Sequence, residues 1–314
     1  MSLAFIFPGQ GSQAIGMGAD LAEAFASARE VFQEVDDALG QKLFALMTAG
    51  DIETLTLTEN AQPALMAVSM AVMRALETEF GVPVTKAAFV AGHSLGEYSA
   101  LAAAGAISLA DTARLLKRRG QAMQRAVPVG EGAMASLIGP KSDVSLAEAA
   151  AQAGSEVGIC VVANDNNAGN VVISGSKAAV DKAIEAAKEL GARAIPLNVS
   201  APFHCPLMQP AADEMAEALA GATILQPKTP LVANVTAEPT HDPEAIRRML
   251  VEQVTGRVRW RESVDFLVGV GGVTRFVEAG AGKVLAGMVK RIAPDTEGLS
   301  LNAPADLEAF AKTL

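Results

Sequence analysis

Short apolar runs alternate with helical spacing along the first part of the chain. The run LAFIF is ended by Pro8 and Gly9, which is typical of a buried strand, and a second apolar run precedes the next glycine-rich turn. Between and after these runs, apolar residues recur every three or four positions. The pattern predicts strands at 3–7 and 87–92, and helices at 20–39, 62–80 and 97–104. Such alternation predicts an α/β fold with a mainly parallel sheet covered on both faces.

The middle of the chain follows a different order. After the turn-rich stretch PVGEG (128–132), the pattern predicts strand 133–139, helix 144–154, strands 157–165 and 170–176, helix 178–190 and strand 192–199. This βαββαβ order is that of a ferredoxin-like unit. We therefore expect a small inserted domain at 129–198. The large domain then comprises 1–128 and 199–314, with further strands at 231–235 and 274–280.

Composition narrows the possible partners. The 314 residues are 50% hydrophobic and 19% charged, which suits a folded globular protein. A net charge of −10, one Trp and one Tyr argue against nucleic acid and anionic membranes as partners. Cys160 and Cys205 form neither a disulfide framework nor a CxxC metal site, so no metal is expected. No signal peptide or long apolar span is evident, so we expect a cytoplasmic protein.

Residues 92–96, GHSLG, carry the first candidate chemistry. They fit the pattern G-x-S-x-G, which in some enzymes places a serine on a sharp turn between a strand and a helix. The expected strand at 87–92 and the expected helix after it provide that context. A serine hydroxyl needs a neighbouring base to act as a nucleophile. Ser94 is therefore a candidate nucleophile if a base can be found.

Three histidines are available as the base. His93 adjoins Ser94, which makes a side-chain contact awkward, and His241 lies in a polar, proline-bounded segment typical of a surface. His204 remains by elimination, although a lone histidine among apolar residues is commonly a hydrogen-bonded core residue. Cys205 is a rival nucleophile, but a buried inert thiol is the better interpretation. No acidic residue between Ser94 and His204 stands out as a third catalytic group.

The first loop, residues 7–18, has two competing interpretations. Gly9, Gly11 and Ala14 fit the dinucleotide fingerprint G-x-G-x-x-A. That fingerprint requires a second strand ending in an acidic residue about 20 positions on, where this sequence has helical spacing. A non-catalytic dinucleotide-binding protein is thus a weaker alternative of a different class. A glycine turn at a strand end also exposes backbone N–H groups that can stabilise an oxyanion.

Five motifs occur in a fixed order along nearly the whole chain: FPGQGSQ, GHSLGEYSAL, KRRGQAMQRAVPVGEGAMAS, SAPFHCPLM and VEAGAGKVL. Together they resemble the malonyl-CoA–acyl carrier protein transacylase family, the acyltransferases of fatty acid and polyketide synthesis. The resemblance implies an α/β-hydrolase-like large domain with a ferredoxin-like small domain. It also implies malonyl transfer from malonyl-CoA to the phosphopantetheine thiol of acyl carrier protein, through a malonyl-serine and without a cofactor, in fatty acid biosynthesis.

The resemblance assigns roles to individual residues. It implies that Ser94 is the acylated nucleophile and His204 its base. The backbone N–H groups of Gln10 and Leu95 would form the oxyanion hole. Arg119 would bind the malonyl carboxylate, which a guanidinium can hold through two parallel hydrogen bonds. Taken without the resemblance, Arg119 is more simply a solvated cation near a helix C-terminus.

Other positions are assigned less directly. The resemblance implies that Gln62 lines the site and that a backbone carbonyl at Gln253 orients the histidine in place of an acid. Phe203 stands where many members have serine, and in related polyketide acyltransferases a phenylalanine here accompanies selection of malonyl over methylmalonyl. Asn164 and Asn166 lie in ANDNNAGN, which departs from the usual family pattern, so they receive no role.

The family's carrier proteins are acidic, so this chain should repel its partner overall. Docking would then need a local basic patch. The candidates are Lys117, Arg118, Arg257, Arg259, Lys283, Lys290 and Arg291. The alternative function is that of a serine hydrolase or thioesterase, which would use the same Ser94–His204 pair and send the acyl group to water.

Overall fold

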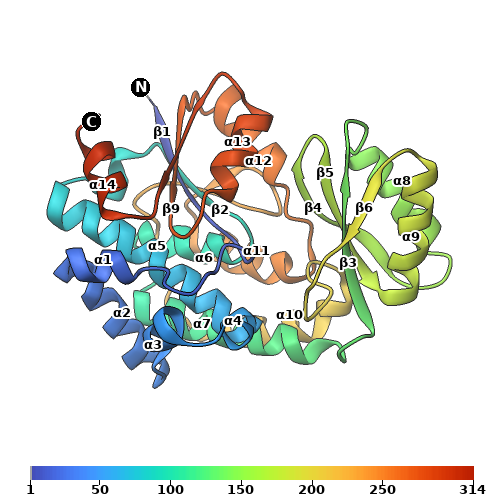
Figure 1. The fold of residues 1–314 in the computed structure, drawn as a ribbon, viewed down its shortest axis with the longest axis horizontal. Coiled ribbons are helices and arrows are strands. Elements are labelled where there is room, and N and C mark those ends of the chain that lie inside the picture. Colours follow the sequence, from blue (N-terminus) through green and yellow to red (C-terminus); the bar gives the residue numbers. More distant parts are fainter. Residues whose placement is uncertain (1) are drawn as a thin grey trace.

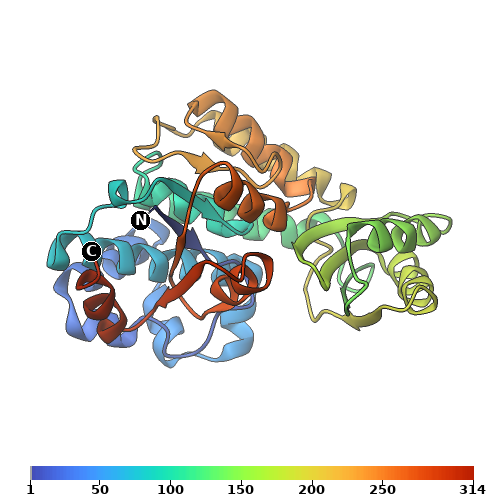
Figure 2. The same ribbon diagram turned by 90° about the horizontal axis from the view of Figure 1, so that it is seen from above.

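The chain folds into a large and a small lobe, each built on its own β-sheet (Figure 1). The computed structural model describes residues 2–314. Seen from above, the small lobe projects from one end of the large one (Figure 2). No helix in this described part is long and apolar enough to cross a membrane.

The large lobe is built on a six-stranded sheet in the order β10-β9-β1-β2-β7-β8. The first four pairings in this order are parallel and only β7 with β8 is antiparallel. The strands are β1 (Leu3–Phe7), β2 (Phe89–Gly92), β7 (Leu231–Val232), β8 (Pro239–Thr240), β9 (Arg275–Ala279) and β10 (Glu297–Leu301). The mainly parallel sheet expected from the sequence is confirmed.

Helices cover both faces of this sheet, and β1 shows why. Its side chains alternate between two apolar clusters, with Phe5 and Phe7 in one and Ala4 and Ile6 in the other, so every residue of the strand is buried. The helices of the large lobe are α1 (Ala19–Ala24), α2 (Ala26–Leu39), α3 (Leu43–Ala49), α4 (Ile52–Thr56), α5 (Thr58–Phe80), α6 (Leu95–Ala103), α7 (Leu109–Ala126), α10 (Gln209–Ala220), α11 (Pro243–Thr255), α12 (Trp260–Gly269), α13 (Val284–Ile292) and α14 (Pro304–Ala311), with short 3₁₀ turns at Val84–Lys86 and Pro206–Met208.

The small lobe has the predicted ferredoxin-like arrangement. Its antiparallel sheet has the order β4-β5-β3-β6, and α8 and α9 pack on one face (Figure 1). The elements are β3 (Gly132–Ile138), α8 (Val144–Gly154), β4 (Cys160–Asn167), β5 (Asn170–Ser176), α9 (Lys177–Glu189) and β6 (Arg193–Pro196). Met134 and Val172 lie on the opposite face of the sheet, with Phe203 of the large lobe packed against them. That face therefore borders the space between the lobes.

Hydrogen bonds and an ion pair also join the two lobes, at a point away from the two chain connections. The backbone N–H of Asp165 donates to the carbonyl of Val258 at 2.9 Å, and the N–H of Val258 donates to Ala163 at 2.8 Å. The buried carboxylate of Asp165 also pairs with Arg261 at 2.9 Å. The predicted domain boundaries at 128/129 and 198/199 fall in the connections between the two sheets. The division at those residues remains a prediction.

Tertiary contacts alter two of the expected elements. The helix expected at 20–39 is broken at Phe25, whose backbone is extended and whose ring packs edge-on against Phe80 with centroids 5.7 Å apart. The strand expected at 231–235 ends at Val232. Beyond it, the side chain of Asn234 turns toward Ser94, so the chain leaves the sheet at this point.

Candidate active site

Ser94 lies on the sharp turn between β2 and α6 that its motif predicted. It adopts φ 53° and ψ −111°, a strained conformation for a residue other than glycine. A Cβ atom on Gly92 would overlap the backbone of Gly96, and one on Gly96 would overlap the carbonyl of Phe7. Both glycines of the motif are thus required for the turn to pass so close to β1.

Asn234 holds this turn from the end of β7. Its Oδ1 accepts the backbone N–H of Ser94 at 2.8 Å, and its Nδ2 donates to the carbonyl of Gly92 at 2.6 Å. The side chain is 1% exposed, and both ends of its amide are satisfied. No motif singled out Asn234 in the sequence, although a lone asparagine in the apolar run LVANV was an available signal.

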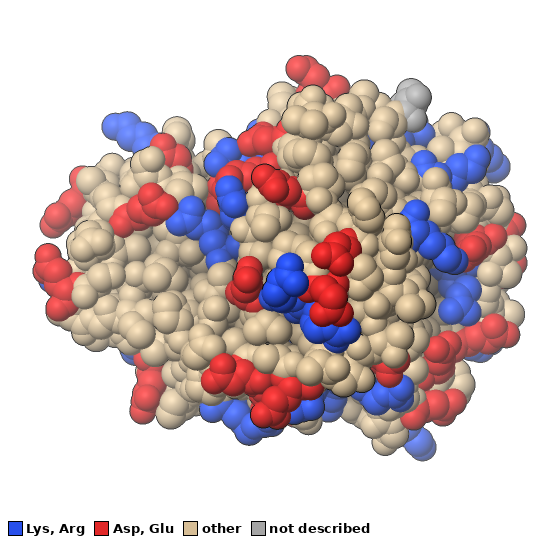
Figure 3. Space-filling view, turned by 180° about the vertical axis from the view of Figure 1, so that it is seen from behind, with Lys and Arg blue, Asp and Glu red and all other residues tan. Residues whose placement is uncertain are grey.

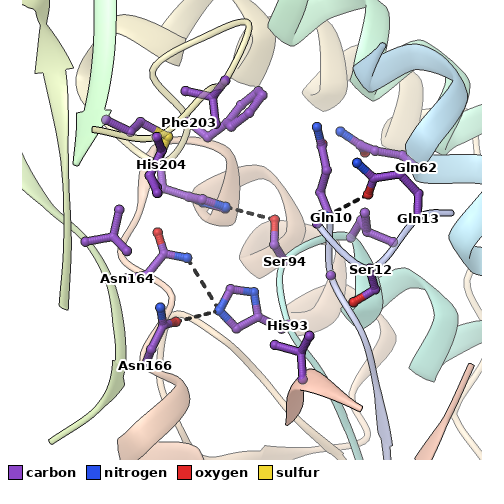
Figure 4. A pocket seen from close by; sticks show the side chains of 18 of the residues that line it. Gln10, Ser12, Gln13, Gln62, His93, Ser94, Asn164, Asn166, Phe203 and His204 are labelled. Carbon is purple, nitrogen blue, oxygen red and sulfur yellow. Dashed lines mark hydrogen bonds between the residues drawn. The ribbon is translucent and has the colours of Figure 1, made fainter. Parts of the chain in front are cut away.

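His204, the candidate base, contacts Ser94 (Figure 4). Its Nε2 lies 2.8 Å from Oγ of Ser94, and its Nδ1 lies 2.9 Å from the backbone oxygen of Gln253. Because a carbonyl oxygen can only accept, Nδ1 carries the proton and Nε2 is left as an acceptor facing the hydroxyl. Gln253 lies near the end of α11, where backbone carbonyls lack partners within the helix.

The imidazole of His204 is held in its neutral form. Burial, reinforced by the positive charge of Arg119, lowers the pKa of His204 from 6.5 to about 3. The hydrogen bond from Nδ1 to the carbonyl of Gln253 acts in the opposite direction but is the weaker influence. A neutral imidazole whose free nitrogen faces a hydroxyl is the arrangement required of a general base.

Arg119 is 1% exposed, so it is not a solvated surface cation. Gly120 lets α7 pack closely against α5, since a Cβ there would lie 2.6 Å from Thr58 O. The guanidinium donates to Oε1 of Gln62 and to Oε1 of Gln253, each at 2.8 Å. Its Nη2 also lies 3.2 Å from Oγ of Ser94. A buried cation is thereby placed directly beside the candidate nucleophile.

Gln10 and Leu95 face the same space from the first loop and from α6. Their backbone N–H groups donate no hydrogen bond to any acceptor in residues 2–314. Leu95 is the first residue of α6, where N–H groups have no partner within the helix and the helix dipole is positive. Both residues line the cavity that contains Ser94. The two N–H groups are therefore available to an oxygen atom of a bound substrate.

The cavity lies between the lobes and has a volume of about 350 Å³. Ser94 lies between His204 on one side and Gln10 and Gln62 on the other (Figure 4). Phe203 contributes an apolar wall together with Val199 and with Met134, Val172 and Leu197 of the small lobe. The site thus combines a few polar groups with an apolar wall, as small-molecule sites commonly do.

His93 points away from Ser94 and belongs to a second cluster of polar side chains in the cavity (Figure 4). Its Nε2 lies 2.9 Å from Oδ1 of Asn166 and 3.4 Å from Nδ2 of Asn164, which belong to β4 of the small lobe. Burial lowers the pKa of His93. The two asparagines, which received no role from the sequence, both lie in the cavity wall.

The remaining candidate histidine and cysteines take no part in the hydrogen bonds around Ser94. His241 is exposed, as expected. The thiol of Cys205 is buried and donates to the carbonyl of Pro202 at 3.1 Å, and burial raises the pKa of Cys160 to about 12. No group of three or more metal-binding side chains occurs in the part of the chain that the structure describes.

The dinucleotide interpretation of the first loop is wrong. After the loop the chain enters α1 and α2, and the acidic residues Asp36 and Asp37 lie within helix α2 instead of at the end of a second strand. The next strand along the chain, β2, comes only after five helices and a 3₁₀ turn.

Residues 4–294 match the acyl transferase domain family. The chain is 44% identical over 313 residues to the malonyl CoA-acyl carrier protein transacylase of Bacillus subtilis, covering 99% of this chain and 97% of the relative. It is 45% identical over 307 residues to the protein of the same name from Escherichia coli, with coverage of 98% and 97%.

Solved structures agree with this assignment. An acyl-carrier-protein S-malonyltransferase from Bartonella henselae is 54% identical and superimposes with a TM-score of 0.96, covering 100% of this chain and 99% of that one. A malonyl-transacylase solved in complex with a type II polyketide synthase acyl carrier protein is 42% identical with a TM-score of 0.96, and all of both chains is covered. With this fold, a Ser94–His204 pair and a buried arginine beside the serine, the chain belongs to the acyl transferase family, among the malonyl CoA-acyl carrier protein transacylases.

Proposed function

We propose that this protein transfers a malonyl group from malonyl-CoA to the phosphopantetheine thiol of acyl carrier protein, through a malonyl ester on Ser94. One observation carries the proposal. Oγ of Ser94 lies within 2.8 Å of Nε2 of His204 and within 3.2 Å of Nη2 of Arg119, inside one cavity. A base and a carboxylate-binding group thus meet at one nucleophile.

The first half-reaction acylates the serine. Nε2 of His204 takes the hydroxyl proton as Oγ of Ser94 attacks the thioester carbonyl carbon of malonyl-CoA. The negative charge that develops on the carbonyl oxygen is stabilised by the N–H groups of Gln10 and Leu95. Loss of one such donor typically costs about 2.7–4 kcal/mol of transition-state stabilisation. The tetrahedral intermediate then collapses, the C–S bond breaks, and His204 returns the proton to the CoA thiolate.

The second half-reaction reverses these roles. His204 removes the proton from the carrier protein's thiol, and the sulfur attacks the ester carbonyl of malonyl-Ser94. The C–O bond breaks, and Ser94 recovers its proton from His204. Each half-reaction exchanges one acyl bond for another, so electrons and protons balance without a redox partner or a metal. We therefore propose that no cofactor is required. The cytoplasmic location stays a prediction.

Selectivity for malonyl follows from Arg119. A malonyl ester on Ser94 carries its carboxylate one methylene away from the carbonyl carbon. The guanidinium beside Oγ lies at a suitable distance to bind such a short diacid. Nε of Arg119 is buried and has no hydrogen-bond partner in the described chain, so the guanidinium is not fully satisfied by protein groups. Phe203 lines the same cavity and would crowd a 2-methyl branch.

The test is to mix the protein briefly with malonyl-CoA and to measure its intact mass before and after adding carrier protein. We expect a malonyl adduct on Ser94 that disappears when carrier protein bearing phosphopantetheine is added and persists when carrier protein without that group is added. Rapid loss of the adduct to water, without transfer to the thiol, would instead indicate a hydrolase.

A further inference from the structure

Glu97 lies in the buried hydrogen-bond network of the site although it does not line the cavity. It is the third residue of α6 and 1% exposed. A buried carboxylate is costly unless it is paired or hydrogen-bonded, so its partners are informative. In the mechanism derived above it has no part.

Two neighbours of Glu97 each hold a reacting group. Nε2 of Gln253 donates to Oε2 of Glu97 at 2.5 Å, and the backbone of Asn234 acts to lower the pKa of this carboxyl group. Gln253 binds both His204 and Arg119, and Asn234 holds the backbone of Ser94.

The amide of Gln253 can satisfy its neighbours in only one orientation. Its Nε2 lies between two acceptors, the carboxyl group of Glu97 and the backbone oxygen of Ser94 at 3.0 Å. Its Oε1 accepts from Nη2 of Arg119. A flipped amide would set oxygen against two oxygens and NH₂ against a guanidinium. Glu97 therefore helps to aim the amide oxygen at Arg119.

The same arrangement keeps Arg119 available to a substrate. No carboxylate in residues 2–314 lies within 4.0 Å of its guanidinium, and Glu97 is separated from it by the amide of Gln253. A carboxylate in direct contact would occupy the donors that a malonyl group needs. Burial raises the pKa of Glu97 to about 7, while Gln253 and Arg119 act to lower it.

We propose that Glu97 is a positioning residue for malonyl selectivity: it holds the amide of Gln253, which in turn holds Arg119 in place for the malonyl carboxylate. The inference rests on the proposed function. It assigns part of the selectivity to a carboxyl group that never touches the substrate.

The test compares rates of Ser94 acylation by malonyl-CoA and by acetyl-CoA, which lacks the carboxylate. Glu97→Leu removes the acceptor and should lower the malonyl-to-acetyl ratio about tenfold or more, because misplacement of a binding group by about 1 Å can cost a hundredfold in rate. Glu97→Gln keeps an oxygen that accepts from Gln253 and should retain most of the ratio. Glu97→Asp keeps the carboxyl group but is one methylene shorter, so it should lower the ratio as well.

Two controls separate positioning from general stability. Leu101→Ala opens a cavity in the same helix at a fully buried position, so it should lower the melting temperature and leave the ratio unchanged. In an Arg119→Ala background, Glu97→Leu should change the ratio no further, because the residue through which it acts is gone.

Three outcomes would overturn the inference. They are equal loss of both rates in Glu97→Leu, an unchanged ratio in Glu97→Asp, and a ratio loss that persists in the absence of Arg119. If Glu97→Leu does not fold, the malonyl-to-acetyl ratio of Glu97→Asp serves as the test. A wild-type protein that takes no malonyl group from malonyl-CoA would instead overturn the proposed function itself. Failure of the proposed function is thus distinguishable from failure of the inference about Glu97.

Discussion

Nη2 of Arg119 lies 3.2 Å from Oγ of Ser94, so the buried cation and the candidate nucleophile are hydrogen-bonded neighbours. A substrate carboxylate held by this guanidinium must therefore lie very near the acyl carbon that Ser94 attacks. This closeness suits a three-carbon diacid, which is why we propose that Arg119 binds the malonyl carboxylate.

Arg119→Ala should accordingly slow acylation by malonyl-CoA far more than acylation by acetyl-CoA. Hydrogen bonds to charged groups contribute about 1.5–3 kcal/mol, which corresponds to roughly a 10- to 150-fold difference between the two substrates. Single-turnover rates followed by intact mass give both values. Arg118→Ala is the matched control, since Arg118 is partly exposed and pairs with Glu214, and it should leave the ratio unchanged. Equal losses with both substrates would make Arg119 structural.

Ser94→Ala should abolish the malonyl adduct, because the attacking oxygen is removed. His204→Ala should slow adduct formation by about 10²–10⁴-fold, the usual contribution of a general base. Peptide mapping of the adduct checks the position. Cys205→Ala should acylate normally, since its thiol is buried and directed at a backbone carbonyl. A malonyl group found on Cys205 would refute the assignment.

Much of the fold could be predicted because the spacing of apolar residues shows whether a helix or strand buries one of its faces or both. The two sheets and the insertion of the small lobe required no more than that pattern. Ser94 could be predicted because its conformation depends on two glycines close in sequence. His204 was reached by elimination among three histidines, and the structure places its ring beside Ser94.

The supporting residues could not be derived from spacing. The atom of Gln253 that orients His204 is a backbone oxygen, which every residue has, so no residue type signals it. Only the resemblance pointed to this position. Asn234 and Glu97 are polar residues inside apolar patterns, and their importance depends on which side chains the fold brings beside them. We propose that the same carbonyl, 2.9 Å from Nδ1 of His204, takes the place of a third catalytic acid.

Acylation should resist acid unusually well. The pKa of His204 is lowered to about 3, so the imidazole stays neutral, and able to accept a proton, down to pH values well below 6.5. With acetyl-CoA as the substrate, we expect similar single-turnover rates at pH 7.5 and pH 5. A base of ordinary pKa 6.5 would lose about 30-fold at pH 5. A fall with a midpoint near pH 6.5 would contradict this assignment.

The Arg119→Ala variant provides the internal check on that pH profile. Removing the nearby positive charge eliminates one cause of the lowered pKa, so the pKa of His204 should rise. The acid limb of acetyl-CoA acylation should then appear at higher pH than in the wild type. An unchanged limb would mean that Arg119 does not act on His204 electrostatically.

The structure narrows the predicted basic docking patch to α13. Most candidate cations already have an acidic partner: Lys117 pairs with Glu59, Arg118 with Glu214, Arg257 with Glu148 and Arg259 with Glu262. On the face shown in Figure 3, basic side chains likewise lie mostly beside acidic ones. Within residues 2–314, Lys283, Lys290 and Arg291 form no ion pair. Lys283 directly precedes α13 and the other two lie in its last turn, while the same helix contributes Val284 and Met288 to the cavity wall.

Reversing the charge of Lys290 and Arg291 together, each to Glu, should therefore weaken the encounter with an acidic carrier protein. We expect the apparent KM for carrier protein to rise about tenfold at low salt, and the difference from wild type to shrink as salt screens the interaction. Acylation of Ser94 by malonyl-CoA should be nearly unchanged. Lys188→Glu is the control, because Lys188 is exposed on α9, which covers the face of the small-lobe sheet turned away from the cavity. If the α13 variant and this control behave alike at low salt, the carrier protein does not dock through α13, because a true docking patch must respond to the sign of its own charges.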